Sequence, residues 1–293
     1  MAVFVTFWGT RGSIPTPGNS TRVYGGNTPC VEVRMDEALF ICDAGSGIRE
    51  LGADLLTRKE APEEMHLLIT HTHWDHIQGF PFFAPAYIPN TRIRVYGTAP
   101  GDESRHRLLS GQMSSSYFPV GFGELKAEIV DDIFADGAKQ VGDTRVVCFP
   151  LNHPGGCFGY AFERNGVKIV YLTDNEIENI PDEVRDDPTA EERLRTVPAE
   201  LVETIRDADL LIADAQYTDA EYEEKRGWGH TSCLTVTDLA IQAGVKKLAL
   251  FHHDPTTTNN SVDERVRLCG ERAAQFKSEI FIFGAREGVT LKF

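Results

Sequence analysis

The run HTHWDH from His71 to His76 constrains this chain most, because it places four potential metal ligands within six residues. It directly follows the apolar stretch Leu67–Thr70, which is typical of a short buried strand. In an extended or turning backbone, residues i and i+2 project to the same side, so His71 and His73 can share one ion. Asp75 and His76, beyond the turn, can reach a second ion. The run therefore predicts a site for two metal ions at the end of a strand.

Two ions need more ligands than this run supplies, and other ligand types also follow apolar stretches. His153 comes after Val146–Leu151, Asp174 after Ile169–Thr173, and His252 after Leu248–Phe251. A carboxylate that bridges two ions is a common device in binuclear hydrolases, because it offsets charge and sets the spacing of the metals. His66 and His106 fit no ligand position, and we expect both at the surface.

Strand-like and helix-like stretches follow one another along the chain, with strands dominating the first half and alternating with helices in the second. The predicted strands are Val3–Trp8, Cys30–Arg34, Ala38–Cys42, Leu67–Thr70, Ile93–Tyr96, Ala127–Val130, Arg145–Pro150, Gly159–Phe162, Lys168–Thr173, Leu210–Ala213, Lys247–Phe251 and Glu279–Phe283. The predicted helices are Ser46–Leu56, Glu103–Met113, Ala199–Arg206, Cys233–Ala243 and Val262–Gln275. This order predicts an α/β fold, an αβ/βα sandwich in which two mixed β-sheets pack face to face with helices outside. We expect one domain over residues 1–293, with an acidic surface excursion around 176–200.

Charge and hydropathy exclude several classes of partner. The 29 Lys and Arg against 44 Asp and Glu give a net charge of −15, which argues against tight electrostatic binding of long nucleic acid. No apolar run approaches the roughly 20 residues that a membrane span requires. The N-terminus lacks the basic region and small-residue cleavage site of a secretion signal. We therefore expect a cytoplasmic protein without a membrane partner.

The ligand pattern as a whole resembles the metallo-β-lactamase superfamily of binuclear hydrolases, over nearly the whole chain. The resemblance implies that the metals lie between the inner edges of the two sheets. It assigns His71, His73 and His153 to the first ion, Asp75, His76 and His252 to the second, and Asp174 to the bridge between them. Asp43 matches an early Asp-x-Gly element of the family, whose implied role is to orient metal ligands. Zinc suits so many imidazoles, with manganese or iron as alternatives, and the family also suggests a homodimer.

Superfamily membership does not determine the reaction, because this fold carries several chemistries. The run WGHTS, Trp228–Ser232, resembles the Gly-His-[Ser/Thr] element of ribonuclease Z-like phosphodiesterases. That resemblance implies that His230 contacts the scissile phosphate and assists the leaving group. Asp214, at another predicted strand end, is a candidate partner for His230. The alternative is a helix N-cap built by Thr231 or Ser232 beside an incidental histidine.

Two further features bear on the substrate. Arg11 lies in a glycine-rich segment whose backbone N–H groups can approach an anion, so it is a candidate phosphate ligand, with a plain turn as the alternative. Only 20 residues separate His153 from Asp174. This interval leaves no room for the long arm with which tRNA-processing members of the resembled group grip their substrate.

These features predict a metal-dependent hydrolase, most specifically a phosphoric diester hydrolase for a small substrate such as a cyclic nucleotide or a cyclic sugar phosphate. A hydroxide held between the two ions would attack phosphorus, and His230 would protonate the leaving oxygen; we expect His230 and Asp75 to be the catalytic side chains. A lactone or thioester hydrolase on the same metals is the alternative, followed by a tRNA 3′-processing endonuclease. A metal-stabilised binding domain without turnover is the non-enzymatic hypothesis.

Overall fold

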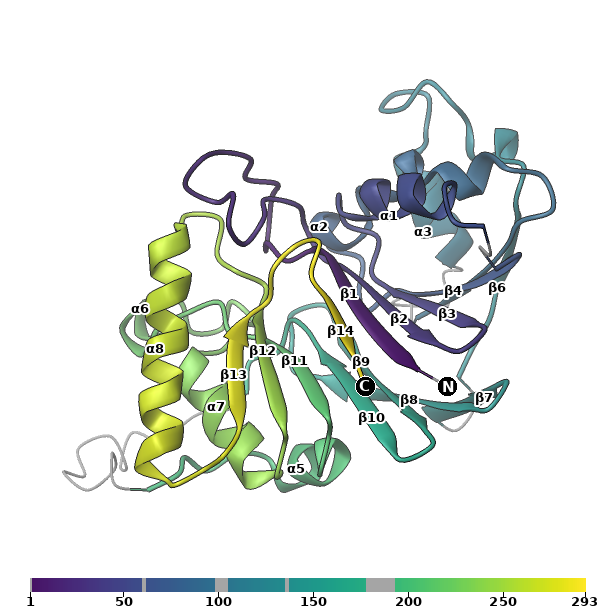
Figure 1. Cartoon of the computed structure of the whole chain (residues 1–293). Helices are drawn as coiled ribbons and strands as arrows, with labels where there is room; N and C mark the ends of the chain where they lie inside the picture. The colour runs from purple at the N-terminus through teal and green to yellow at the C-terminus, as the bar shows by residue number, and fades with distance from the viewer. Residues whose placement is uncertain (1, 60–61, 98–104, 135–136, 178–192) are drawn as a thin grey trace.

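Two β-sheets pack face to face, and helices cover the outer face of each (Figure 1). The structure is a computed structural model that describes residues 2–59, 62–97, 105–134, 137–177 and 193–293. The predicted acidic excursion around 176–200 falls largely on residues 178–192, which lie outside this description. Among the described residues, no helix combines the length and the apolar composition needed to cross a membrane.

The first sheet has seven strands in the order β14-β1-β2-β3-β4-β5-β6. Its strands are β1 (Val3–Gly9), β2 (Cys30–Met35), β3 (Ala38–Cys42), β4 (Glu64–Leu68), β5 (Arg92–Tyr96), β6 (Glu128–Asp131) and β14 (Thr290–Lys292). Strands β3 to β6 run parallel, so their carboxyl ends share one edge of the sheet. The outer face carries α1 (Ile48–Leu55), α2 (Trp74–Ile77), α3 (Arg105–Gln112) and the 3₁₀ turns η1 (Phe80–Phe82), η2 (Ala84–Tyr87) and η4 (Phe122–Glu124).

The second sheet also has seven strands, in the order β13-β12-β11-β10-β9-β8-β7. Its strands are β7 (Ala138–Val141), β8 (Thr144–Leu151), β9 (Cys157–Arg164), β10 (Val167–Leu172), β11 (Leu210–Asp214), β12 (Lys247–Phe251) and β13 (Phe281–Gly284). Strands β10 to β13 run parallel, so they too deliver their following residues to one edge. The helices on this side are α5 (Ala199–Ile205), α6 (Asp219–Glu224), α7 (Cys233–Gln242) and α8 (Asn259–Gln275).

Three apolar clusters hold the layers together. The central one lies between the sheets and includes Phe40 from the first and Phe162 from the second, whose rings lie 5.0 Å apart. The outer clusters join each sheet to its helices. Helix α1, for example, buries Ile48, Leu51 and Leu55, the spacing expected of an amphipathic helix. Burial of both faces explains why central strands such as β11 and β12 are nearly continuous apolar runs.

The predicted αβ/βα sandwich is confirmed, and the differences from prediction are local. Strands β7 and β14 and helix α6 were not expected: β7 is short and polar, and β14 has only three residues. Both strands exist because a neighbour supplies their hydrogen bonds, as β1 does for β14. The expectation of a surface position for His66 was wrong, because its ring is buried against Tyr96, with Nδ1 2.9 Å from the hydroxyl.

Candidate metal centre

The run from His71 to His76 begins just beyond β4 and turns at once into the short helix α2, with His73 in extended backbone before the first helical residue. The side chains therefore leave the backbone in different directions within a few residues. The structure gathers them with residues that follow strands of the second sheet, and two groups of potential ligands result.

The first group comprises His71, His73, His153 and Asp174, whose ligand atoms all lie within 4.8 Å of one another. Nδ1 of His73 lies 3.1 Å from Nε2 of His153. Oδ2 of Asp174 lies 3.5 Å from Nε2 of His71 and 3.8 Å from Nε2 of His153. The nitrogens and the carboxylate oxygen thus converge on one point.

The second group comprises Asp75, His76, Asp174 and His252. Oδ1 of Asp174 lies 3.3 Å from Nε2 of His76 and 3.2 Å from Nε2 of His252. Oδ2 of Asp75 lies 3.3 Å and 3.2 Å from the same two nitrogens. Asp174 therefore turns one oxygen toward each group, which is the arrangement of a bridging carboxylate.

The residues of both groups fit divalent cations. Nε2 of His71 is buried without a hydrogen-bond partner, a costly state that a metal ion would relieve. Although burial lowers the pKa of His76, the carboxylates of Asp174, Asp75 and Asp43 raise it well above its usual value. The site thus has a strongly negative field that favours a cation. Imidazole and carboxylate donors together suit zinc, manganese or iron.

Nδ1 of three candidate ligand histidines donates to a fixed acceptor, which leaves Nε2 directed at the site. His76 donates to Asp43 (2.8 Å), His153 to the carbonyl of Gly229 (2.8 Å), and His252 to Oε1 of Gln216 (3.0 Å). The sequence indicated Asp43 as such a partner but not Gln216. Asp214 is the last residue of β11 and Gln216 lies two residues beyond it, so its place after a strand end was the one sequence feature that pointed to the site.

Asp43 is itself held in place. Its carboxylate accepts from the backbone N–H of Thr70 (2.8 Å) and from the hydroxyl of Tyr171 (2.9 Å). Thr70 directly precedes His71, so Asp43 links the end of β3 to the start of the ligand run. Tyr171 lies within β10, and nothing in its sequence position indicated this contact.

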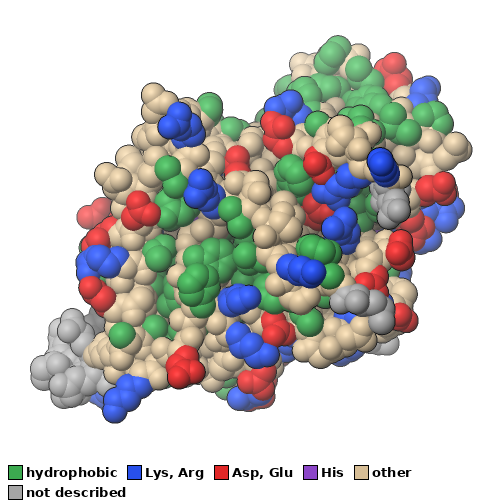
Figure 2. Space-filling model, viewed as in Figure 1, with side chains coloured by type: hydrophobic (Ala, Val, Ile, Leu, Met, Phe, Trp, Pro, Cys, Tyr) green, Lys and Arg blue, Asp and Glu red, His purple; other side chains and the backbone are tan. Residues whose placement is uncertain are grey.

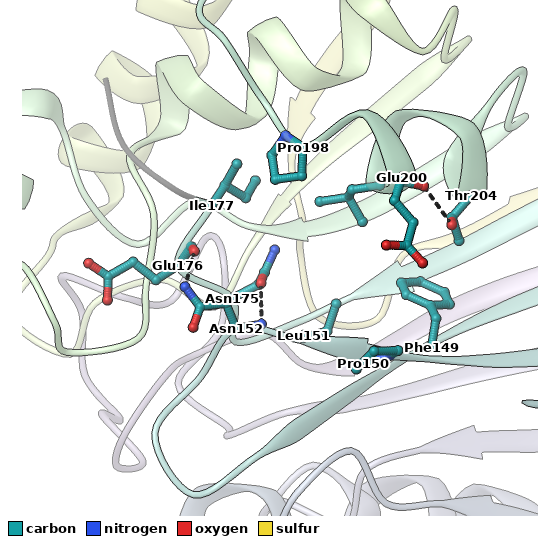
Figure 3. Close-up of a pocket in the computed structure, with 11 residues that line it drawn as sticks. Phe149, Pro150, Leu151, Asn152, Asn175, Glu176, Ile177, Pro198, Glu200 and Thr204 are labelled. Carbon is teal, nitrogen blue, oxygen red and sulfur yellow. Dashed lines mark hydrogen bonds between the residues drawn. The ribbon is translucent and has the colours of Figure 1, made fainter. Parts of the chain in front are cut away.

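The loops after β8 and β10 are joined by three hydrogen bonds, two of which Figure 3 draws. The backbone N–H of Asn152 donates to Oδ1 of Asn175 (2.8 Å), and its side-chain amide donates to the carbonyl of Glu176 (2.8 Å). The N–H of Glu176 donates in return to the carbonyl of Asn152 (2.7 Å). This connection holds His153 and Asp174, which are neighbours of the joined residues, at one place.

A cavity of about 200 Å³ lies behind these loops (Figure 3). Its lining includes Phe149, Leu151, Ile177 and Leu201, so it is largely apolar. None of the candidate metal ligands is among the residues that line it. We therefore locate the chemistry at the ligand groups and not in this cavity.

His230 lies next to both groups. Its ring stacks on that of His252 (centroids 5.0 Å apart, 21° between planes) and lies 5.3 Å from that of His153. Nδ1 donates to Oδ2 of Asp214 at 2.8 Å, which leaves Nε2 available. Burial lowers the pKa of His230, but the charge and hydrogen bond of Asp214 outweigh this and raise it to about 9.

Asp214, His230 and His252 also bring potential ligand atoms within 4.8 Å of one another. The helix N-cap considered from the sequence is present as well: Ser232 caps α7 by accepting from the N–H of Thr235. The N-cap and the hydrogen bond between His230 and Asp214 are therefore both present.

Arg11 is fully buried. Its guanidinium donates to the carbonyls of Gly25, Asp254 and Thr257. This position does not favour the predicted contact with phosphate, because these carbonyls already occupy the donors. The same segment reaches the site through its backbone, where the N–H of Ser13 donates to Oδ2 of Asp75 (2.8 Å).

The sequence matches the family model described as "Beta-lactamase superfamily domain" over residues 39–253, a range that includes Asp43 and all seven candidate ligands. A protein of Halobacterium salinarum named Ribonuclease Z is 27% identical over 323 residues, covering 99% of this chain and 97% of the relative.

Solved structures share the fold. A diphosphatase from the PhnP family has a TM-score of 0.66 at 19% identity, covering 99% of this chain and 98% of the other. The short form of human tRNase Z has a TM-score of 0.65 at 19% identity, with 98% of each chain covered.

Proposed function

The chain belongs to the β-lactamase superfamily of domains, which are metal-dependent hydrolases, and on that premise we propose that it is a phosphodiesterase for small substrates. We further propose that the substrate is a cyclic nucleotide or a cyclic sugar phosphate. The observation that carries this proposal is the His230–Asp214 pair, which lies beside both ligand groups with Nε2 of His230 available.

The two ligand groups would hold two divalent ions, with His71, His73 and His153 in one, Asp75, His76 and His252 in the other, and Asp174 shared. Ions bound there would supply Lewis-acid chemistry, which offsets charge on phosphoryl oxygens and lowers the pKa of water.

Protonation of the leaving oxygen is assigned to side chains of the protein itself. His230 holds a proton on Nε2 and donates it to the departing oxygen, which avoids release of an unstable alkoxide. Asp214 holds the ring by its other nitrogen and stabilises the charged form of the imidazole. Burial of the pair excludes water that would compete for this proton.

The proposal of a small substrate is based on the segment between His153 and Asp174. Strands β9 and β10 and their tight turns occupy it, so no arm projects there. Side chains of both charges are interspersed over the face in Figure 2, among the residues drawn in colour. The net charge of −15 supports a small substrate over a polyanion.

Processing of tRNA is the second candidate, because full-length relatives at 25–27% identity carry the name Ribonuclease Z. Those names support phosphodiester chemistry at this site whichever substrate is correct.

The deciding experiment compares wild type and His230→Ala on bis(p-nitrophenyl) phosphate, a precursor tRNA, a lactone and a thioester, with zinc or manganese. We expect the wild type to cleave the small phosphodiester. On a cyclic nucleotide tested beside it, whose leaving alkoxide needs a proton as p-nitrophenolate does not, we expect the variant to lose about 100-fold or more in kcat, the usual contribution of a general acid. Both proteins should hold about two ions per chain.

Turnover of the lactone or thioester alone would contradict the proposal. The protein would then be a carbon-ester hydrolase, and His230 would not have its proposed role. Preference for precursor tRNA would select the second candidate. His230→Gln, which keeps the size of the side chain, is the matched variant that separates loss of the proton donor from loss of packing.

A further inference from the structure

The buried carboxylate of Glu176, which the proposed chemistry does not use, accepts hydrogen bonds from the loop that precedes His230. Glu176 is only 8% exposed. Its Oε1 accepts from the N–H of Gly227 (2.8 Å) and from the hydroxyl of Tyr222 (2.9 Å), and its Oε2 accepts from the N–H of Gly229 (3.0 Å). In Figure 3 its side chain extends away from Leu151 of the apolar cavity. One carboxylate therefore holds both glycines that flank Trp228.

The flanking glycines leave this loop little freedom. Gly227 and Gly229 have φ of 79° and 87°, in the left-handed region that other residues rarely adopt. A Cβ at Gly229 would lie 2.1 Å from Nδ1 of His153, so this backbone passes directly over a metal-ligand candidate. The carbonyl of Gly229 also accepts from that nitrogen. Trp228 is thus fixed at the site by contacts on either side of it.

Although its backbone is held on both sides, the side chain of Trp228 is 63% exposed. Single exposed apolar residues are ordinary on protein surfaces. Here, however, a buried carboxylate and two left-handed glycines hold the backbone that carries an exposed indole, two residues from His230. An exposed aromatic ring on a held backbone is the kind of surface on which a flat ring stacks.

We propose that Trp228 is a specificity-determining residue that stacks on a nucleobase of the substrate, and that Glu176 is the positioning residue that holds it there. This inference rests on the proposed phosphodiesterase function and deepens it, because it favours a nucleotide over a sugar phosphate. The phosphate would lie toward His230 and the base over the exposed indole.

The test uses two probes that differ only by a base, adenosine 5′-monophosphate and ribose 5-phosphate, titrated calorimetrically into the zinc-loaded full-length protein. We expect wild type to bind the nucleotide at least about fivefold more tightly, as one base–aromatic stack provides. In Trp228→Ala this preference should fall to within twofold, whereas Trp228→Phe should keep most of it. Glu176→Gln should weaken the preference and keep the metal content, because the amide nitrogen cannot accept from a glycine N–H.

Phe281→Ala is the matched control, since Phe281 is 61% exposed and pairs with the start of β12, the end opposite His252. It should leave the preference unchanged. An undiminished preference in Trp228→Ala, or no preference in wild type, would overturn the inference. Because binding is measured separately from hydrolysis, a base preference without phosphodiester turnover would count against the proposed function and not against the stack.

Discussion

At the residue scale, the site depends on side chains held in unusual backbone conformations. Asp43 and His252 have φ of 63° and 57°, in the left-handed region. Asp and His enter this region more readily than most residues, but it still costs free energy. Both lie directly after strands β3 and β12, where the chain must turn sharply to aim a side chain at the ligand groups. The cost is offset by the hydrogen bonds that each makes.

His66 provides a pH test that is independent of the metals. Burial lowers its pKa from 6.5 to about 4, so the folded protein holds it neutral where the unfolded chain is protonated. Stability from the neutral ring is therefore complete above about pH 6.5 and is lost as the pH falls toward 4, by up to about 3 kcal/mol. We expect the free energy of unfolding of wild type to fall more steeply over this range than that of His66→Gln.

The measurement is urea unfolding of EDTA-treated protein at several pH values between 7 and 4.5. EDTA removes the contribution of metal release, and other histidines titrate equally in both proteins. Parallel pH profiles for the two proteins would show that His66 is protonated at no cost in the folded state.

At the element scale, the ends of parallel strands bring the ligands together. The parallel strands of each sheet deliver their following residues to one edge, and the two edges face each other across the site. The loop between β1 and β2 closes over this edge: the N–H of Gly12 donates to the carbonyl of His253 at 2.9 Å. A glycine is required there, because a Cβ would lie 2.5 Å from Cε1 of His252.

Gly12→Ala is therefore expected to displace the His252 ring. We predict loss of about one of the two metal ions and a fall of about tenfold or more in activity, similar to other changes that misorient a ligand. Metal analysis and kcat check this.

Gly270→Ala in α8 is the control: its position is helical and open, so it should keep both ions and raise the free energy of unfolding by about 0.5–1 kcal/mol. Full metal content in Gly12→Ala would contradict the close contact with His252.

At the scale of the whole molecule, the ligand groups connect the two halves of the sandwich. The run from His71 to His76 follows a strand of the first sheet, and His153, Asp174 and His252 follow strands of the second. Ions bound to both groups would join these halves, so metal binding should contribute to the stability of the entire fold.

Removal of metal should therefore lower the melting temperature. A ligand at 1,000 times its dissociation constant stabilises by about 4 kcal/mol, which corresponds to a decrease on the order of 10 °C for a chain of this size. Calorimetric scans before and after EDTA, with metal content measured in both samples, check this. Zinc should restore the transition and magnesium should not. An unchanged melting temperature in protein shown to have lost its metal would contradict the expected contribution of metal binding to the stability of the fold.

The sequence by itself determined the class of fold and the candidate ligands, because both depend on patterns among residues that are close together in the chain. Apolar runs mark strands, and histidines or carboxylates directly after them mark strand ends, so His153, Asp174 and His252 could be named without coordinates. That residues 1–293 form one domain, and that the chain forms a homodimer, stay predictions.

Only the tertiary structure decided which atoms of these side chains face each ligand group and which other residues hold them in place. It alone turns one oxygen of Asp174 toward each ligand group and buries Arg11 among carbonyls. It also assigns Gln216 and Glu176 to hold His252 and the loop of Trp228. These contacts join residues that lie far apart in the chain, and their hydrogen bonds form only when packing of the sheets brings the loops together. No local periodicity encodes such pairs, because their partners are chosen by the fold.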